Sequence, residues 1–238
     1  MNSPYGLPCV ENCLNCHLRS ESFFCALPQE SLEALNQIKH AAVYPERSVI
    51  FVEGQTPRGI FMLCQGRAKV STTSRDGKTF ILRIAKAGEV LGLDATVTGR
   101  PHDATVETMQ PCQLDFVSRE DFLPFLKKHG DACLHAAQHL SSDYRDACEV
   151  VRSVGLSHSI SGRLAKFLLE SSAEGQVSNG VVRSKLTLTH EEISQLIGTS
   201  RETITRIFSE FRKMEIVELK GSTLIVHDKA ALGRLVAA

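Results

Sequence analysis

The spacing of apolar residues divides the chain into a strand-rich region flanked by helical regions. Between about Ala41 and Phe116, short apolar and β-branched runs alternate with glycine-containing turn signals. Asp76-Gly77 separates two of these runs, and Asp-Gly in that position is typical of a β-hairpin. Short strands at this spacing favour a sandwich or a barrel. The runs expected to form strands are Ser48–Val52, Gly59–Leu63, Ala68–Ser71 and Thr79–Ile84.

Helical periodicity appears on both sides of this region. A first helix is expected from Pro28, because Leu32, Leu35 and Ile38 follow at helical spacing. Helical character returns near Arg119.

The segment Asp131–Val154 contains neither glycine nor proline and carries a narrow apolar stripe. Its apolar residues lie alternately four and three positions apart, which is a heptad pattern over roughly three repeats. This pattern predicts a dimerisation helix, and the alternative is an ordinary amphipathic helix packed on its own domain. The stripe comprises Cys133, Ala137, Leu140, Tyr144, Ala147, Val151 and Val154.

The following residues predict a hinge, a helix and a loop. Small polar residues over Gly155–Ser161 indicate the hinge, and a helix is expected over Gly162–Ser171. Residues 174–180 are expected to form a loop, and short helices with two short strands complete the chain.

Residues 186–214 carry the pattern of two short helices joined by a tight turn. Thr189 and Glu192 fit a capping box, which predicts a helix beginning at His190. Gly198 suits the turn, because a residue without Cβ adopts positive φ at little cost.

The second helix of this pair is expected over Arg201–Met214, with Ser200 as its N-cap. One face is apolar and the other polar, so the pair has the helix-turn-helix arrangement. The apolar face comprises Ile204, Ile207, Phe208 and Phe211, and the polar face Arg201, Glu202, Thr205, Arg206, Arg212 and Lys213.

The polar face of the second helix predicts contacts with double-stranded DNA. In a helix-turn-helix this helix lies in the major groove, where arginine can bind guanine and glutamate can bind cytosine. Glu202 and Arg206 are four residues apart and therefore share one face. Ser200 and Thr203, at the helix N-terminus, suit phosphate contacts. The predicted DNA-binding residues are Ser200, Arg201, Glu202, Thr203, Thr205 and Arg206.

A hairpin is expected directly after this helix pair. Ile216–Leu219 and Thr223–Val226 flank a turn at Lys220-Gly221-Ser222, which corresponds to the wing of a winged helix. The alternative is a solvated face on a structural helix pair, with Glu202 and Arg206 forming only a surface ion pair. The turn, cap and wing together favour DNA binding.

Length and composition limit the remaining possibilities. A chain of 238 residues suits two modest domains, and its formal net charge of zero means that any DNA footprint is local. No apolar run is long enough to span a membrane and no signal peptide is recognisable, so we expect a cytoplasmic protein without a membrane partner. No His-Glu-x-x-His, Gly-x-Ser-x-Gly or phosphate-loop motif indicates an enzyme.

Eight cysteines are unusual for a cytoplasmic chain, where clustered cysteines more often bind metal or sense redox state than form disulfides. Four lie in the first 27 residues, and the C-x2-C spacing of Cys13 and Cys16 lets one loop present two thiolates. We expect Cys64, Cys133 and Cys148 to be small buried hydrophobic residues.

Thr199–Arg206 closely resembles the recognition helix of the CRP/FNR family. The resemblance covers nearly the whole chain, including the β-roll glycines Gly54, Gly66, Gly77 and Gly88. It implies an α+β fold with an N-terminal β-roll (a jelly roll like that of cyclic-nucleotide-binding domains), a long dimerisation helix and a C-terminal winged helix-turn-helix. The expected domains are a cysteine-rich segment 1–27, a β-roll sensor 28–130, a dimerisation helix 131–155 and a DNA-binding domain 156–238.

The resemblance also implies a homodimer on a palindromic site, in which Glu202 and Arg206 read half-sites with a TGA core. Arg201 is similar to the CRP branch and Thr205 to the FNR branch, so the type of half-site stays open. RNA polymerase is expected as a further partner. The residues expected in the dimer contact are Leu140, Tyr144, Ala147, Val151 and Val154.

The cyclic-nucleotide branch of the family holds phosphate with an Arg-Ser pair after a Gly-Glu loop. Gly88-Glu89 is present here, but the corresponding stretch Gly99–Ala104 lacks the pair and contains Asp103. Because a carboxylate would repel the phosphate, we expect no cyclic nucleotide.

The FNR branch instead binds a [4Fe-4S] cluster through three N-terminal cysteines and one distant cysteine. Glu107–Cys112 resembles the segment that carries the distant ligand. The resemblance therefore implies Cys13, Cys16, Cys25 and Cys112 as ligands, with Cys9 as a possible substitute. Eight residues separate Cys16 from Cys25, whereas five are typical of the family.

An intact cluster is expected to brace the N-terminal segment against the β-roll and the dimerisation helix. Attack by oxygen or nitric oxide would loosen this brace, weaken the dimer and remove the avidity of two half-sites. Zinc binding, thiol–disulfide sensing, a vestigial site and a small effector are the alternatives. A ligand-binding sensor module without a role on DNA is a further alternative, which the winged helix disfavours.

Overall fold

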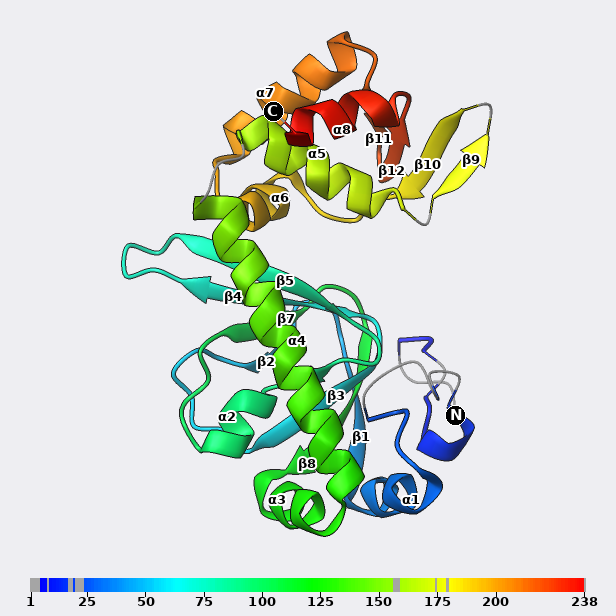
Figure 1. The fold of residues 1–238 in the computed structure, drawn as a ribbon, viewed down its shortest axis with the longest axis vertical. Coiled ribbons are helices and arrows are strands. Elements are labelled where there is room, and N and C mark those ends of the chain that lie inside the picture. Colours follow the sequence, from blue (N-terminus) through cyan, green and yellow to red (C-terminus); the bar gives the residue numbers. More distant parts are fainter. Residues whose placement is uncertain are drawn as a thin grey trace. The chain divides into compact units, whose positions relative to one another are not determined.

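The computed structural model describes residues 5–7, 9–16, 19, 24–155, 159–173, 175–178 and 180–237. The chain forms two compact units, Met1–Ala147 and Cys148–Ala238, and most of their elements are labelled in Figure 1. No helix within the described ranges is both long and apolar enough to cross a membrane.

The first unit contains a β-roll of two four-stranded antiparallel sheets, with strand orders β1-β8-β3-β6 and β2-β7-β4-β5. The four strands expected from the apolar pattern are confirmed as β2, β3, β4 and β5. The β4–β5 hairpin turns at Asp76-Gly77, where Gly77 has a φ of 84°. The strands are β1 Lys39–Tyr44, β2 Val49–Phe51, β3 Gly59–Gln65, β4 Arg67–Thr73, β5 Thr79–Lys86, β6 Val90–Leu91, β7 Thr105–Thr108 and β8 Cys112–Ser118.

Within the described part of the first unit, five helical segments accompany the roll. The helix expected from Pro28 is confirmed as α1, for which Pro28 is the N-cap, and Leu32 and Leu35 are buried. The helix expected near Arg119 is confirmed as α3, which Ser118 caps. The segments are the 3-10 turn η1 Cys13–Asn15 and the helices α1 Gln29–Ile38, α2 Leu93–Thr98, α3 Arg119–Lys128 and α4 Gly130–Gly155.

Two hydrophobic clusters lie on opposite faces of the sheet that contains β3 and β8. The first fills the interior of the roll and includes Cys112 and Leu114 of β8. The second packs the outer face of the sheet against the helices and includes Val117, together with Phe122 of α3. Because successive side chains of a strand point to opposite faces, Asp115 lies on the outer face with Val117.

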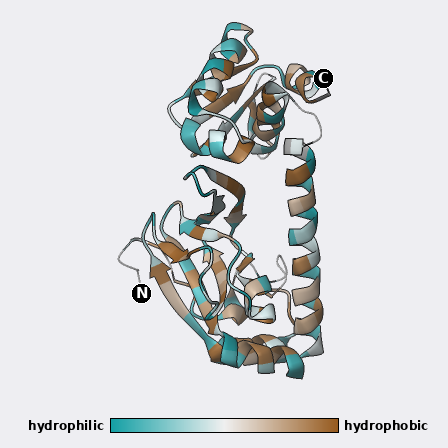
Figure 2. Ribbon diagram, turned by 90° about the vertical axis from the view of Figure 1, so that its left-hand side faces the viewer, coloured by the Kyte–Doolittle hydropathy of each residue, from teal (hydrophilic) through white to brown (hydrophobic). Residues whose placement is uncertain are grey.

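Helix α4 leaves most of its apolar stripe exposed within the single chain. The exposed fraction is 72% for Tyr144 and 67% for Val151, while Leu140 packs partly against the outer cluster. The side chain of Val154 lies outside the described part of the chain. Hydrophobic turns recur along this helix in Figure 2. Cys133 is exposed, so its prediction as a buried residue is wrong; it belongs to the stripe that faces away from its own unit.

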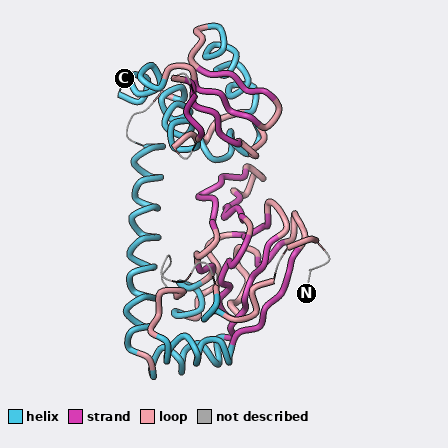
Figure 3. The backbone as a smooth tube through the Cα atoms, turned by 90° about the vertical axis from the view of Figure 1, so that its right-hand side faces the viewer, coloured by secondary structure: helices cyan, strands magenta, loops and turns pink. Residues whose placement is uncertain are grey.

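In its described residues, the second unit combines helices α5 to α8 with an antiparallel sheet of strand order β11-β12-β10-β9. Figure 3 shows these helices and strands together. The loop expected over residues 174–180 is wrong in part, because residues 176–178 form strand β9 and pair with β10. All three of these residues are exposed, so they lack the buried–exposed alternation that indicates a strand. The elements are α5 Ile160–Ser171, β9 Gln176–Ser178, β10 Val181–Lys185, α6 His190–Ile197, α7 Arg201–Lys213, β11 Val217–Lys220, β12 Thr223–Val226 and α8 Lys229–Ala237.

Replacing Gly66 by alanine is expected to destabilise the roll more than replacing Gly77. Both glycines have positive φ, which costs an alanine about 1–2 kcal/mol. A Cβ at Gly66 would also overlap the Cys112 sulfur and lie 2.8 Å from the Pro111 carbonyl oxygen, whereas nothing lies within 4 Å at Gly77. Overpacking adds about 1–3 kcal/mol to the loss in the free energy of unfolding for Gly66→Ala. Urea unfolding followed by circular dichroism measures this difference, and equal losses in the two variants would contradict it.

Candidate nucleic-acid interface and cysteine-lined pocket

The first helix of the predicted pair is held by the local signals that its sequence contains. Thr189 and Glu192 form the complete capping box of α6: the Thr189 hydroxyl accepts from the Glu192 backbone N–H, and the Glu192 carboxylate accepts from the Thr189 N–H. Gly198 ends the helix with a φ of 75°, as the turn requires. Ile193 and Ile197 are buried, and Leu196 is half-buried.

The second helix, α7, separates its two faces as the sequence predicts. Ser200 is the N-cap and its hydroxyl accepts from the Thr203 backbone N–H at 3.2 Å. The Thr203 hydroxyl lies 3.1 Å from that of Ser200. Four apolar side chains fix the orientation of the helix, because they are almost completely buried. These are Ile204, Ile207, Phe208 and Phe211.

The opposite face of α7 exposes the predicted base-reading side chains. Arg201, Glu202 and Arg206 are exposed, and the Arg206 guanidinium donates to the Glu210 carboxylate at 2.7 Å. This exposed pair leaves the other guanidinium N–H groups of Arg206 available for a partner. Hydrogen bonds from its own backbone N–H and from Ser200 lower the pKa of Glu202, so the carboxylate is charged at neutral pH and can act as an acceptor.

Thr205 is connected to the first helix. Its hydroxyl lies 3.0 Å from Nδ1 of His190 and donates to the Arg201 carbonyl oxygen at 3.0 Å. The His190 ring stacks on Phe208 with 4.9 Å between the ring centroids. Burial, together with the charge of Arg201, lowers the pKa of His190 and keeps the ring neutral.

The predicted wing is confirmed as the β11–β12 hairpin. Lys220 pairs with Thr223, so that Gly221 and Ser222 form a two-residue turn. Gly221 has the positive φ of 58° that such turns require. The exposed hairpin tip and the exposed face of α7 therefore lie in the same compact unit.

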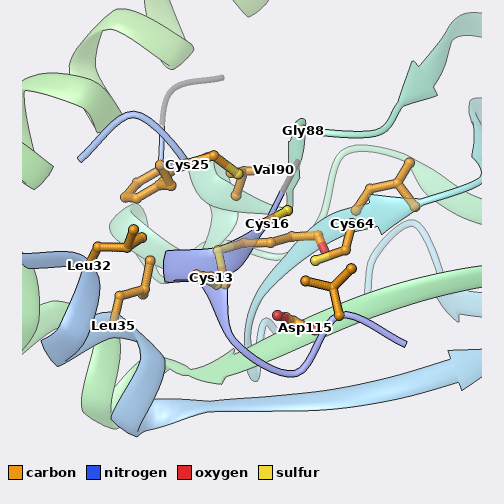
Figure 4. Close-up of a pocket in the computed structure, with 13 residues that line it drawn as sticks. Cys13, Cys16, Cys25, Leu32, Leu35, Cys64, Gly88, Val90 and Asp115 are labelled. Carbon is orange, nitrogen blue, oxygen red and sulfur yellow. The ribbon is translucent and has the colours of Figure 1, made fainter. Parts of the chain in front are cut away.

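A pocket in the first unit gathers four of the eight cysteines. Cys13, Cys16 and Cys25 line it from the N-terminal segment, and Cys64 lines it from strand β3 (Figure 4). The pocket contains roughly 450 Å³ of space, including open solvent. The rest of its lining is apolar except for Asp115, and comprises Val10, Phe24, Leu32, Leu35, Met62, Leu63, Gly88 and Val90.

Hydrogen bonds attach the N-terminal segment to the roll beside this pocket. The Gln113 amide donates to the Val10 carbonyl oxygen at 2.7 Å and accepts from the Val10 N–H at 2.8 Å. Asn36 of α1 accepts from the Cys13 N–H at 3.1 Å. Cys13 is therefore held against α1, and Val10, which precedes it, is held against β8.

A buried ion pair adjoins the pocket, and its acidic partner, Asp115, belongs to the lining. The Lys39 ammonium donates to the Asp115 carboxylate, and both side chains are almost fully buried. Burial lowers the pKa of Lys39, but the hydrogen bond and charge of Asp115 outweigh it and the net pKa is raised. The charges of Lys39 and Asp115 act on the neighbouring thiols of Cys13 and Cys64, and the Cys64 thiol donates to the Met62 carbonyl oxygen at 3.6 Å.

Two of the pocket thiols, those of Cys13 and Cys64, have raised pKa values that favour their protonated form. Burial raises the pKa of Cys13, although Lys39 opposes the shift. Burial, with the nearby charge of Asp115, raises the pKa of Cys64 further. No group of three or more histidine, cysteine or acidic side chains in the described ranges has metal-binding geometry, so ligation would require rotation of these thiols and loss of their protons.

The structure does not bring Cys112 to the pocket. Its side chain is fully buried inside the roll, and its thiol donates to the carbonyl oxygens of Gln110 at 3.1 Å and Arg67 at 3.3 Å. Cys9 is half-buried and does not line the pocket. Cys64 was expected only as a packing residue. Cys64 follows Ile60 and Met62 at two-residue spacing along β3, so it lies on the same outer face of the sheet. This alternation is the sequence signal that could have located Cys64.

The Gly-Glu loop of the roll is engaged within the protein. The Glu89 carboxylate accepts from the Arg83 guanidinium and, at 2.9 Å, from the Lys86 backbone N–H. Arg83 lies 3.6 Å from Asp143 of α4. Glu89 is therefore committed to contacts that link the loop to β5 and α4.

The exposed reading face, the capped helix pair and the wing define a winged helix-turn-helix DNA-binding protein attached to a β-roll. Residues 42–129 match the family model described as a cyclic nucleotide-binding domain, and residues 162–235 match the Crp-like helix-turn-helix domain. The chain thus belongs to the CRP/FNR family of DNA-binding transcription regulators, whose members are not enzymes.

Individual relatives resemble the chain over most of its length. It is 23% identical over 189 residues to the cAMP-activated global transcriptional regulator CRP of Pasteurella multocida, which covers 79% of this chain and 90% of that protein. It is 22% identical over 218 residues to the CRP-like cAMP-activated global transcriptional regulator of Mycobacterium tuberculosis, covering 91% of this chain and 97% of that protein. The structure of FixK2 from Bradyrhizobium japonicum has a TM-score of 0.73 at 20% identity, covering 84% of this chain and 98% of that one, and shares its fold.

Arg206→Ala is expected to weaken binding to a duplex selected by the wild-type protein from a random pool. A bidentate arginine–guanine pair contributes about 1–3 kcal/mol, which corresponds to a loss of about 5- to 150-fold in affinity per half-site. The matched control is Glu210→Gln, which removes the ion-pair partner of Arg206 but leaves its guanidinium in place. Titration by fluorescence anisotropy at fixed salt measures both variants. Unchanged affinity of Arg206→Ala would show that this side chain does not read the DNA.

Proposed function

We propose that this protein is a homodimeric transcription regulator that is switched by an oxygen- and redox-sensitive [4Fe-4S] cluster. The observation that carries the proposal is the gathering of Cys13, Cys16 and Cys25 in one pocket against the β-roll. Iron–sulfur clusters are held by cysteine thiolates, and an apolar surround tunes such sites. A fourth thiol and a mainly apolar lining in the same pocket fit this donor set.

The DNA-reading part of the proposal assigns Glu202 and Arg206 to the bases of a TGA-type half-site in a palindrome. Ser200 and Thr203, at the N-terminus of α7, would hold phosphate, and Arg201 and Thr205 flank the reading pair. Exposure of the reading pair supports this assignment. RNA polymerase is the proposed partner of the DNA-bound protein.

The homodimer is proposed to form along α4. An apolar stripe that one chain leaves exposed can be buried against the same stripe of a second copy. Two copies engage two half-sites together, so loss of the dimer also loses the avidity of the palindrome. The proposed contact residues are Leu140, Tyr144, Ala147, Val151 and Val154.

The chemistry that a bound cluster supplies is reactivity towards oxygen and nitric oxide. The residues of this chain connect its pocket to the dimerisation helix. Val90 lines the pocket, and its N–H donates to Nε2 of His139 on α4 at 3.1 Å. The other ring nitrogen of His139 must then carry the proton that it donates to Asp143, 3.1 Å away. A change at the pocket wall would therefore act directly on α4.

A cyclic nucleotide, as in the relatives named cAMP-activated, is not proposed as the effector. Glu89 is held by Arg83, and the stretch Gly99–Ala104 contains Asp103 and no Arg-Ser pair. A thiol–disulfide switch or another small effector without a cluster is the second candidate, favoured by the absence of metal-binding geometry among the described side chains. The iron content of the protein separates these candidates.

Anaerobically purified protein is expected to be brown and to contain iron and sulfide in equal amounts. Exposure to air is expected to remove this colour and to lower operator affinity by about 100-fold or more, because dimer avidity is lost. Iron and acid-labile sulfide analysis, paired with DNA titration before and after air, measures the response. Cys16→Ala should abolish it, whereas Cys148→Ala, which changes a half-buried cysteine outside both the pocket and the apolar stripe of α4, should not. A colourless, iron-free wild-type protein with unchanged DNA affinity would rule the cluster out.

His139→Ala is expected to separate cluster loading from DNA binding. It removes the acceptor of the Val90 N–H and the contact with Asp143, but none of the pocket cysteines. Iron content should stay at the wild-type level, while the difference in operator affinity between anaerobic and aerated protein should shrink. The neighbouring exposed residue provides the control variant Gln138→Ala. A wild-type oxygen response in His139→Ala would exclude this route to α4.

A further inference from the structure

We propose that Cys64, and not Cys112, supplies the fourth thiolate beside Cys13, Cys16 and Cys25. This inference rests on the proposed cluster and names its ligands. The four cysteines line one pocket, and all four are labelled in Figure 4. Cys13 lies in η1 and Cys16 directly follows it, Cys25 precedes α1, and Cys64 lies in β3. The four ligands would therefore join the N-terminal segment to the roll.

The register of β3 places Cys64 on the correct face of the sheet. Ile60 and Met62 belong to the outer cluster, and Cys64 continues the same alternation along the strand. Leu63, which lies between Met62 and Cys64 in the strand, belongs to the cluster inside the roll. The register shifts between Leu63 and Gln65, so Cys64 has no paired residue in β8 at this irregularity.

The register of β8 places Cys112 on the opposite face. Cys112 and Leu114 lie inside the roll, whereas Gln113 and Asp115 face the N-terminal segment. The thiol of Cys112 already has two carbonyl acceptors, and Gly66 packs directly against it. Bringing its sulfur to the pocket would require β8 to turn over, which would also reverse Asp115 and Val117.

The test compares cysteine variants after anaerobic reconstitution with ferrous iron and sulfide. Loss of a ligand is expected to lower metal affinity at least about tenfold, since even outer-shell partners cost 10- to 100-fold. Cys64→Ala and the more conservative Cys64→Ser should therefore lose most iron and sulfide and the visible absorption. Cys112→Ala and the surface control Cys133→Ala should keep wild-type amounts. Circular dichroism of each apoprotein checks the fold.

The outcomes separate a failure of the Cys64 assignment from a failure of the proposed cluster. Wild-type iron content in folded Cys64→Ala, or its loss in folded Cys112→Ala, overturns the assignment and leaves the cluster in place. A wild-type protein that takes up no iron overturns the proposed function and the assignment together. If both Cys64 variants fail to fold, the double variant Cys9→Ala/Cys112→Ala decides. Full iron content there supports Cys64 as the ligand, because no other cysteine lines the pocket with the N-terminal three, and its loss overturns the assignment.

Discussion

The two-residue repeat of strands β3 and β8 is the constraint on which the β-roll of this protein depends. It gives one sheet two chemically different faces, so that Leu114 fills the roll while Asp115, the next residue, lines the cysteine pocket. A shift of one residue in the pairing would exchange these faces. The core of the roll and the pocket are therefore specified by the same hydrogen-bonded register, and neither can change independently of the other.

The DNA-binding half depends on local rules instead. The capping box at Thr189, the left-handed Gly198 and the N-cap Ser200 are each determined within a few residues. Burial of four apolar side chains on one side of α7 leaves its polar side in solvent. The exposed polar surface of α7 thus follows from amphipathic packing, and the polar residues at these positions determine its chemistry.

This contrast explains what the sequence could predict. The four strands between Ser48 and Ile84, helices α1, α3 and α4, the helix-turn-helix and its wing all follow from periodicity and turn chemistry, and all are present. The position of Cys112 could not be obtained from its motif, because a motif identifies a residue without stating which face of the sheet it occupies.

The remaining features depend on long-range pairing. Lys39 and Asp115 are 76 positions apart, and only the β1–β8 register shows that they meet. Strand β9 escaped prediction because its exposed side chains leave no periodic signal, and its existence depends on the neighbouring β10.

The buried Lys39–Asp115 pair also restricts which substitutions related sequences can accept at these two positions. Loss of either partner alone would leave an isolated charge in an apolar interior, at a cost of about 3–5 kcal/mol, which is a large part of the stability of an ordinary domain. Related sequences should therefore keep both residues or exchange both for a neutral pair. A lineage with only one of them would need a new counter-charge at the same depth.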